Sequence, residues 1–171
     1  MLAVRRDMGR ATGYRLLSAY APLPRGAQQP RGRAGDPMTD EELKTLCEEK
    51  WDCEIVNYGG EFASVDGYVI KGGNVIAHIE RKVRNVRKGD YPTAILDCRK
   101  WVGLLAAEFA TGIPSILAYG WDCGRAGFVK PSKGIKVETA ICRPSMDSVS
   151  LNAVVARAVV HIPISEFEVI R

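Results

Sequence analysis

Two acidic residues and a lysine lie close together in the run VDGYVIKGGNVIAHIERKV, which spans residues 65–83. Asp66 stands at its start, and Glu80 and Lys82 stand at its end. Two carboxylates that meet on one sheet resist joint ionisation unless a cation lies between them. Oxygen ligands of this kind suit Mg²⁺ or Mn²⁺ better than Zn²⁺. A cation held there could polarise a phosphoryl oxygen and activate a bound water, which Lys82 could orient.

Two strands joined by a tight turn would bring these groups together. Phe62 to Lys71 and Asn74 to Val83 are predicted to be strands, and the Lys-Gly-Gly-Asn sequence that joins them has the composition of a hairpin turn. Because side chains alternate across a strand, Glu80 and Lys82 are predicted to share one face. Asp66 lies on the opposite arm of the hairpin, within reach of Glu80.

Each of these residues also has an interpretation that involves no chemistry. An acid-x-lysine triplet is common by chance, and Asp66-Gly67 could itself form a type I′ hairpin turn. The Gly-Gly turn a few residues later makes a second turn unnecessary. His78, on the same face as Glu80, is more typical of a packed strand residue than of a ligand. Lys100 lies on a predicted helix, where both a solvated charge and a functional role are open.

The remaining elements are predicted from periodicity and capping residues. A helix should begin at Thr39 or Asp40, either of which can cap it, and continue to about Lys50. Thr93 to Thr111 is predicted as one long helix because its apolar residues recur at helical spacing, and Gly112 ends it. Further strands are predicted over Glu54 to Asn57, Ser115 to Tyr119, Gly127 to Lys130, Ile135 to Cys142 and Val159 to Ile162, whereas Asn152 to Val160 fits a helix or a strand. This order predicts an α/β fold in which helices flank a mixed sheet.

Length and composition restrict the class of protein. At 171 residues, 46% hydrophobic and 26% charged, the chain has the composition of one soluble globular domain. No apolar run approaches the roughly 20 residues that span a bilayer, so no membrane role is expected. The net charge of +4 is uneven, because residues 1–37 carry seven arginines and two aspartates, whereas the other 134 residues carry 17 basic and 18 acidic groups. Affinity for nucleic acid must therefore come from a local patch or from the N-terminal segment.

Residues 1–37 are predicted to be a disordered basic extension, and residues 38–171 a single domain. The extension is rich in Arg, Gly, Pro and Ala and cannot bury enough apolar surface to offset its chain entropy. Three interpretations stay open for it: a nucleic-acid-binding tail, an organellar presequence, or an upstream extension of a protein that starts at Met38. Five dispersed cysteines without a CxxC pair indicate reduced thiols in the cytoplasm and argue against a zinc site.

Asp66 and, after thirteen intervening residues, the triplet Glu80-Arg81-Lys82 resemble the motif of the PD-(D/E)XK nuclease superfamily. This superfamily includes restriction endonuclease-like and Holliday junction resolvase-like enzymes. The resemblance covers roughly Glu41 to Lys130. It implies an α-β-β-β-α-β core with a central mixed β-sheet flanked by helices. It also implies that Asp66 and Glu80 are the metal-binding acids and that Lys82 is the catalytic lysine.

The resemblance implies two further site residues on helices and reveals two departures. Many members carry an acid on the first helix, where Glu42 or Glu41 is the nearest match. Some carry a basic or polar residue on the helix after the motif, a place that Lys100 fits. Val65 stands where proline is common, and Arg81 occupies a position that is usually apolar and buried. Arg81 must therefore reach solvent at the end of the sheet or pair with an acid.

The expected function is that of a Mg²⁺-dependent deoxyribonuclease, most simply an endonuclease, with DNA as its partner and a homodimer as one assembly. Arg84, Arg87 and Lys88 would form a basic rim that contacts the phosphate backbone. The resemblance extends to small phage-type nucleases, which implies the cytoplasm of a bacterium or of a phage-infected host. Two alternatives stay open: a catalytically inactive nucleic-acid-binding protein on the same fold, and a small virion or host-interaction protein whose triplet is accidental.

Overall fold

The computed structural model describes residues 37–59, 63, 65–142 and 157–171. In chain order, its elements are α1 (Asp40–Trp51), β1 (Glu54–Asn57), β2 (Gly67–Lys71), β3 (Asn74–Arg84), β4 (Thr93–Asp97), α2 (Cys98–Thr111), β5 (Ser115–Trp121), β6 (Ala126–Val129), the 3₁₀ helix η1 (Pro131–Lys133), β7 (Glu138–Cys142), β8 (Arg157–Pro163), the 3₁₀ helix η2 (Ile164–Glu166) and β9 (Glu168–Val169). The order α1, β1, β2, β3, α2, β5 follows the expected α-β-β-β-α-β core, with β4 inserted before α2. Apart from residue 37, the predicted disordered extension lies outside the described residues.

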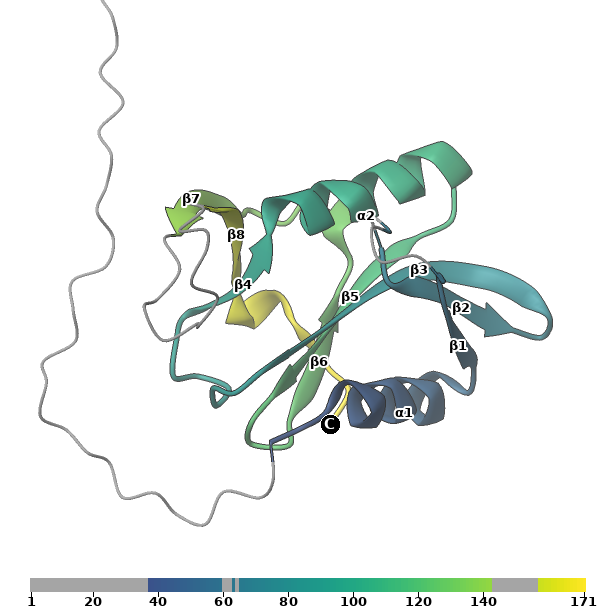
Figure 1. Ribbon diagram of the computed structural model, residues 1–171, viewed down its shortest axis with the longest axis horizontal. Coiled ribbons are helices and arrows are strands. Elements are labelled where there is room, and N and C mark those ends of the chain that lie inside the picture. Colours follow the sequence, from purple (N-terminus) through teal and green to yellow (C-terminus); the bar gives the residue numbers. More distant parts are fainter. Residues whose placement is uncertain (1–36, 60–62, 64, 143–156) are drawn as a thin grey trace, which may run out of the picture. The chain divides into compact units, whose positions relative to one another are not determined.

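A six-stranded sheet in the order β1-β2-β3-β5-β6-β9 forms the centre of the fold. β3 and β5 pair in parallel and the other neighbours are antiparallel, which confirms the predicted mixed sheet. The helices α1 and α2 lie on opposite faces of this sheet (Figure 1). One apolar cluster joins α1 to the face that carries Ile79 and Ala118, and the other joins α2 to the face that carries Leu117 and Tyr119. Every residue of β5 is consequently buried.

The predictions of α1 and of the Gly-Gly turn between β2 and β3 are confirmed, whereas the strand predicted over Phe62 to Lys71 begins only at Gly67, because Val65 and Asp66 lie outside β2. Thr39 caps α1 and forms a reciprocal capping box with Glu42. In the hairpin, Gly72 and Gly73 have φ angles of +59° and +78°. A type I′ turn requires positive φ at both central residues, which glycine adopts without strain. Among the described residues, no helix is long and apolar enough to cross a membrane.

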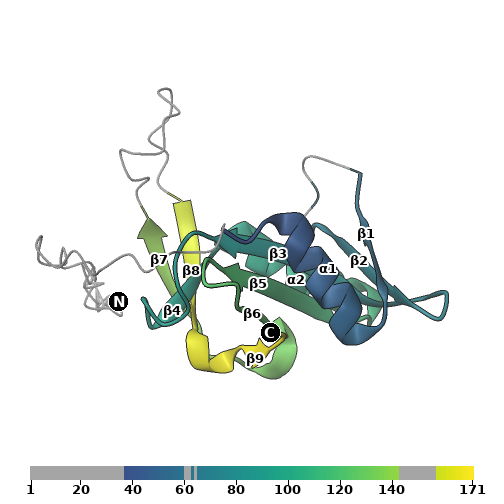
Figure 2. The ribbon, with the colours of Figure 1, turned by 90° about the horizontal axis from the view of Figure 1, so that it is seen from below.

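A second sheet of three antiparallel strands, in the order β4-β8-β7, has no counterpart in the sequence-based prediction (Figure 2). The predicted helix from Thr93 is therefore wrong over its first five residues, because Thr93–Asp97 pair with β8 and α2 begins only at Cys98. Asp97 ends the strand and caps the helix, since its Oδ1 accepts a hydrogen bond from the Arg99 backbone N–H at 2.8 Å. The strand prediction for Val159 to Ile162 is confirmed by β8, whereas residues 143–156 lie outside the described part.

Candidate functional site

Next to Asp66 the pairing of β2 with β3 stops, and the sheet has an open end there. The β2–β3 ladder ends with the pair Gly67 and Ile79, so within the described residues no strand borders β3 on that side from Glu80 onward. Asp66 Oδ2 instead accepts a hydrogen bond from the Arg81 backbone N–H at 2.9 Å. Its carbonyl accepts one from the Tyr58 backbone N–H at 2.8 Å. Main chain and side chain together therefore fix the Asp66 carboxylate at the open end of the sheet.

Strand packing, and not a turn, explains why position 67 is a glycine. It pairs with Asn57 in the β1–β2 ladder. A Cβ atom at Gly67 would collide with the carbonyl oxygen of Val56, so the close approach of β1 requires glycine here. The interpretation of Asp66-Gly67 as a type I′ hairpin turn is therefore wrong.

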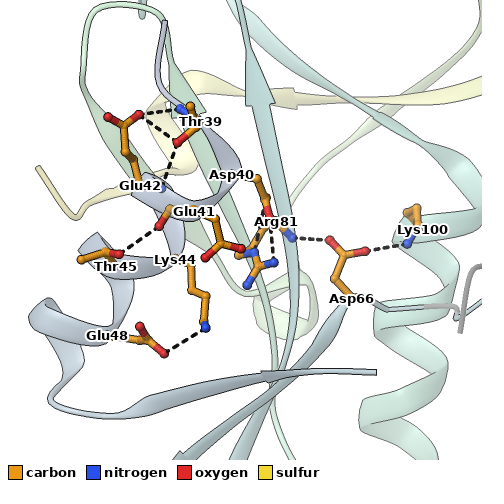
Figure 3. A network of polar contacts seen from close by, with 10 residues as sticks. All are labelled: Thr39, Asp40, Glu41, Glu42, Lys44, Thr45, Glu48, Asp66, Arg81 and Lys100. Atoms are coloured by element: carbon orange, nitrogen blue, oxygen red, sulfur yellow. Dashed lines mark hydrogen bonds and ion pairs between the residues drawn. The ribbon is translucent and has the colours of Figure 1, made fainter. Parts of the chain in front are cut away.

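The ammonium of Lys100 links the two acids of the motif. Its Nζ donates to Asp66 Oδ1 and to Glu80 Oε2, each at 2.9 Å, and lies 3.4 Å from the carbonyl oxygen of Ala63. Figure 3 shows Lys100 and Arg81 on either side of Asp66. Lys100 stands in the first turn of α2, so the helix presents it to the face of β3 that carries Glu80. The structure thus brings together Asp66, Glu80 and Lys100, which lie far apart in the sequence.

Burial and charge separate the protonation behaviour of these three groups. Only 4% of the Glu80 side chain is exposed, and burial together with the nearby Asp66 raises the pKa of Glu80 to about 7 even though Lys100 opposes the shift. Burial also acts to raise the pKa of Asp66, but the hydrogen bonds from Arg81 and Lys100 outweigh it and the pKa is lowered. Burial acts to lower the pKa of Lys100, but its bonds to both carboxylates outweigh that effect and raise it. Asp66 and Lys100 therefore form a charged pair, and Glu80 titrates near neutrality.

Lys82 lies beside this cluster but does not join it. It is half-buried, and among the described residues its ammonium makes no hydrogen bond or ion pair. Burial lowers the pKa of Lys82, the charge of Arg84 lowers it further, and the charges of Glu80 and Asp66 partly offset these effects. The effect of the Glu80 charge on the pKa of Lys82 is consistent with the prediction that both side chains share one face of the strand.

Arg81 points to the other face of β3, toward the start of α1. Its side chain is 4% exposed. Its Nη2 donates to Asp40 Oδ2 at 2.7 Å and its Nε donates to Asp40 Oδ1 at 3.3 Å, whereas Nη1 has no partner among the described residues. The prediction that Arg81 would pair with an acid if it did not reach solvent is confirmed. This pair connects α1 to the strand that carries Glu80.

The acid of α1 that lies near the candidate site is not the one expected from the sequence. Glu42 Oε2 accepts hydrogen bonds from the backbone N–H and the hydroxyl of Thr39 at 2.7 and 3.0 Å, so its carboxylate is engaged in the capping box and not brought to Asp66. The acid of α1 that shares a pocket with Asp66 and Lys100 is Asp40. This pocket has a volume of about 380 Å³. Sequence reasoning considered Asp40 only as a cap, although the need of Arg81 for an acid was a signal for it.

The predicted basic rim is not a uniform row of solvated charges. Lys88 Nζ lies 5.2 Å from the centre of the Trp121 ring, at cation–π distance. Arg84 is half-buried beside Tyr119 and acts to lower the pKa of that phenol, although burial raises it overall. Arg87 is exposed. His78 is packed and 6% exposed, with its Nε2 2.9 Å from Thr111 Oγ1, as expected of a structural strand residue.

The donor set around Asp66 and Glu80 suits a hard cation. It consists only of oxygen, with two carboxylates and the Ala63 carbonyl around one point. Such a set fits Mg²⁺ or Mn²⁺. Within the described residues, no group of three His, Cys, Asp or Glu side chains could hold a metal by itself. A cation at this place would therefore complete its coordination with main-chain oxygens, water or substrate.

No protein-family model matches the sequence, and no curated protein matches it significantly. Among solved structures, the chain is similar to Hjc, a Holliday junction resolvase from the archaeal hyperthermophile Archaeoglobus fulgidus. The two chains are 17% identical and superpose with a TM-score of 0.40, over 51% of this chain and 72% of the resolvase chain. A likeness this distant does not place the chain in a family, so its function is inferred from its own residues.

Proposed function

We propose that this protein is a metal-dependent nuclease that hydrolyses phosphodiester bonds of DNA. The observation that supports this function best is the convergence of two carboxylates on one cation position, since Asp66 and Glu80 each place an oxygen 2.9 Å from the Lys100 ammonium. Asp66 and Glu80 would hold Mg²⁺ or Mn²⁺ there. The bound cation would polarise a phosphoryl oxygen and lower the pKa of a water.

The neighbouring groups of the protein orient the two carboxylates and place a lysine ammonium beside them. The backbone N–H of Arg81 fixes the direction of the Asp66 carboxylate, and burial holds Glu80 at the floor of the site. Lys82 lies on the same face as Glu80 with no acceptor among the described residues, and burial lowers its pKa. Its ammonium is therefore available to donate to the attacking water or to an oxygen of the phosphate.

DNA is the proposed partner because the open end of the sheet leads to a basic segment. Three basic residues come shortly after the motif in the sequence, namely Arg84, Arg87 and Lys88. They add positive charge to the segment that follows Glu80 and Lys82. Contacts from such side chains to phosphate oxygens position a duplex without reading its sequence. Internal cleavage is proposed because the site lies at an open pocket, which is lined by Asp66 and Lys100.

A cleavage assay tests this function. Supercoiled plasmid, linear duplex, four-way junction and RNA are incubated with Mg²⁺ and with Mn²⁺. Asp66→Asn and Glu80→Gln should each reduce cleavage to the level without protein, because each removes one of the two anionic ligands. Glu49→Gln removes the same charge from an exposed position of α1 and should cleave like the wild type. Cleavage that persists in both site variants contradicts the proposal.

The same fold without catalysis is the second candidate. It is favoured by one observation, namely that the Lys100 ammonium already lies between the two acids. A nucleic-acid-binding protein could use this arrangement as a permanent ion pair. It would bind DNA in the presence of a chelator and would cleave no substrate in either cation.

A further inference from the structure

The ammonium of Lys100 occupies the place between the two acids that a bound cation would take. Its Nζ lies 2.9 Å from Asp66 Oδ1, 2.9 Å from Glu80 Oε2 and 3.4 Å from the Ala63 carbonyl oxygen. Three oxygens thus surround a group that has three N–H donors. The same oxygens form the proposed ligand set for Mg²⁺. An ammonium and a divalent cation therefore compete for one position.

The two cations exclude each other for reasons of distance and charge. Lys100 keeps the two carboxylate oxygens at 2.9 Å, whereas Mg²⁺ requires its oxygens at about 2.1 Å. Two cations on the same oxygens would also repel each other strongly where water is partly excluded. Lys100 must therefore withdraw when a divalent cation binds.

The side chain can withdraw while its helix stays in place. Trp101 and Leu104, its neighbours on α2, are buried in the apolar cluster and hold the helix against the sheet. The Lys100 side chain is 27% exposed and lines the pocket of about 380 Å³, whose lining also includes Asp40, Asp66, Asn57 and Tyr58. Its flexible four-carbon stem can rotate toward this space.

We propose that Lys100 is an internal counter-ion that bridges Asp66 and Glu80 in the metal-free protein and is displaced from its place between them by the divalent cation. The inference rests on the proposed function for the position and class of that cation. It goes beyond that function because it assigns to Lys100 the control of cation affinity. The protein then needs more Mg²⁺ than two free carboxylates would need, since each binding event must break the bonds of one ammonium.

Chemical labelling of the unmodified sequence tests the displacement directly. The protein is treated with acetic anhydride at several Mg²⁺ concentrations, and acetylation of each lysine is followed by mass spectrometry. Lys100 should react slowly without Mg²⁺ and several-fold faster when Mg²⁺ saturates the site. Lys133, whose Nζ lies 2.9 Å from Glu168 on the surface, is the internal control and should not change. A Lys100 rate that is independent of Mg²⁺ overturns the inference.

Calorimetric titration with Mg²⁺ tests the competition. Lys100→Met should bind Mg²⁺ roughly 10-fold more tightly than the wild type or better, because no charge-assisted hydrogen bonds need to be broken. Lys133→Met should bind like the wild type. Equal or weaker binding by Lys100→Met overturns the inference. If Lys100→Met does not fold, Lys100→Gln takes its place, and the labelling result decides without any variant.

Failure of this inference and failure of the proposed function are distinguishable, because neither readout involves cleavage. Tighter Mg²⁺ binding by Lys100→Met without cleavage of any substrate keeps the competition and removes the nuclease. Cleavage that depends on Asp66 together with unchanged labelling of Lys100 keeps the nuclease and removes the competition. Absence of Mg²⁺ binding in both the wild type and the Lys100 variant overturns both.

Discussion

Two clusters of ion pairs lie on the two faces of β3, and they differ in the ratio of positive to negative groups. On the α1 face, the Arg81 guanidinium is 4% exposed and forms two hydrogen bonds with a single carboxylate, that of Asp40. On the α2 face, a single ammonium, that of Lys100, is shared by Asp66 and Glu80. The first cluster is a closed pair of one cation and one anion. The second has one carboxylate more than its bound ammonium can neutralise.

This difference indicates what each cluster is suited to do. A balanced pair holds two elements together, and the buried Arg81 with the half-exposed Asp40 connects β3 to the start of α1. An excess of negative charge is costly in a half-buried place, and the pKa of Glu80, raised to about 7 by burial with a further contribution from Asp66, reflects that cost. A divalent cation bound between the two acids would remove this cost. The unbalanced cluster is therefore the one suited to chemistry.

The largest expected effect separates the two clusters by stability. Asp40→Asn should lower the free energy of unfolding by about 2–3 kcal/mol, because it leaves the buried Arg81 guanidinium without a counter-charge. Asp66→Asn should cost less than half of this, because Lys100 keeps Glu80 as its partner and one repulsion between acids is removed. Urea denaturation of the metal-free proteins measures both values.

Activity should follow the opposite order. Asp66→Asn should abolish cleavage, whereas Asp40→Asn should keep it at temperatures where the variant is folded. The far-ultraviolet circular dichroism of each variant serves as the control for folding. A stability cost of Asp66→Asn that equals or exceeds that of Asp40→Asn would contradict the distinction between a structural pair and a cation site.

A smaller effect is expected from pH on the metal-free protein. The pKa of Glu80 is raised from its ordinary value of 4.5 to about 7, so the folded state holds a proton that the unfolded state has released. Stability contributed by Glu80 is therefore full below its ordinary pKa and is lost as the pH rises through about 7. Between about pH 5 and about pH 7 this loss should amount to about 2 kcal/mol.

Comparison of the wild type with Glu80→Gln isolates this contribution. The difference in unfolding free energy between the two proteins should shift by that amount across the range, to the disadvantage of the wild type. The subtraction is needed because burial lowers the pKa of His78, which acts in the opposite direction. The lowered pKa of Asp66 has its effect only near and below 3.8. A difference that does not vary with pH would show that Glu80 is ionised throughout.

The parts of the fold and site that follow from local rules could be predicted from the sequence. The Gly72-Gly73 turn determines the hairpin, and the alternation of side chains then places Glu80 and Lys82 on one face and Arg81 on the other. The helix α1 begins after Thr39, which was one of the two residues predicted to cap it. These features depend on residues that are near one another in the chain.

The parts that depend on distant partners could not be predicted. Thr93–Asp97 form a strand because β8 supplies their hydrogen bonds, although their apolar residues continue the helical spacing of α2. The pairing of Arg81 with Asp40 joins residues 41 positions apart, and the sequence showed only that some acid was needed. The position of Lys100 between Asp66 and Glu80 depends on how α2 packs on the sheet.

The central claim is that Asp66 and Glu80 together hold a divalent cation, and calorimetric titration with Mn²⁺ tests it most directly. The wild type and Glu49→Gln should each bind Mn²⁺ at one site with the same affinity. Asp66→Asn should show no binding heat at the same concentrations, while its circular dichroism stays that of the wild type. Equal Mn²⁺ binding by Asp66→Asn and Glu49→Gln, or no binding by the wild type, would contradict the claim.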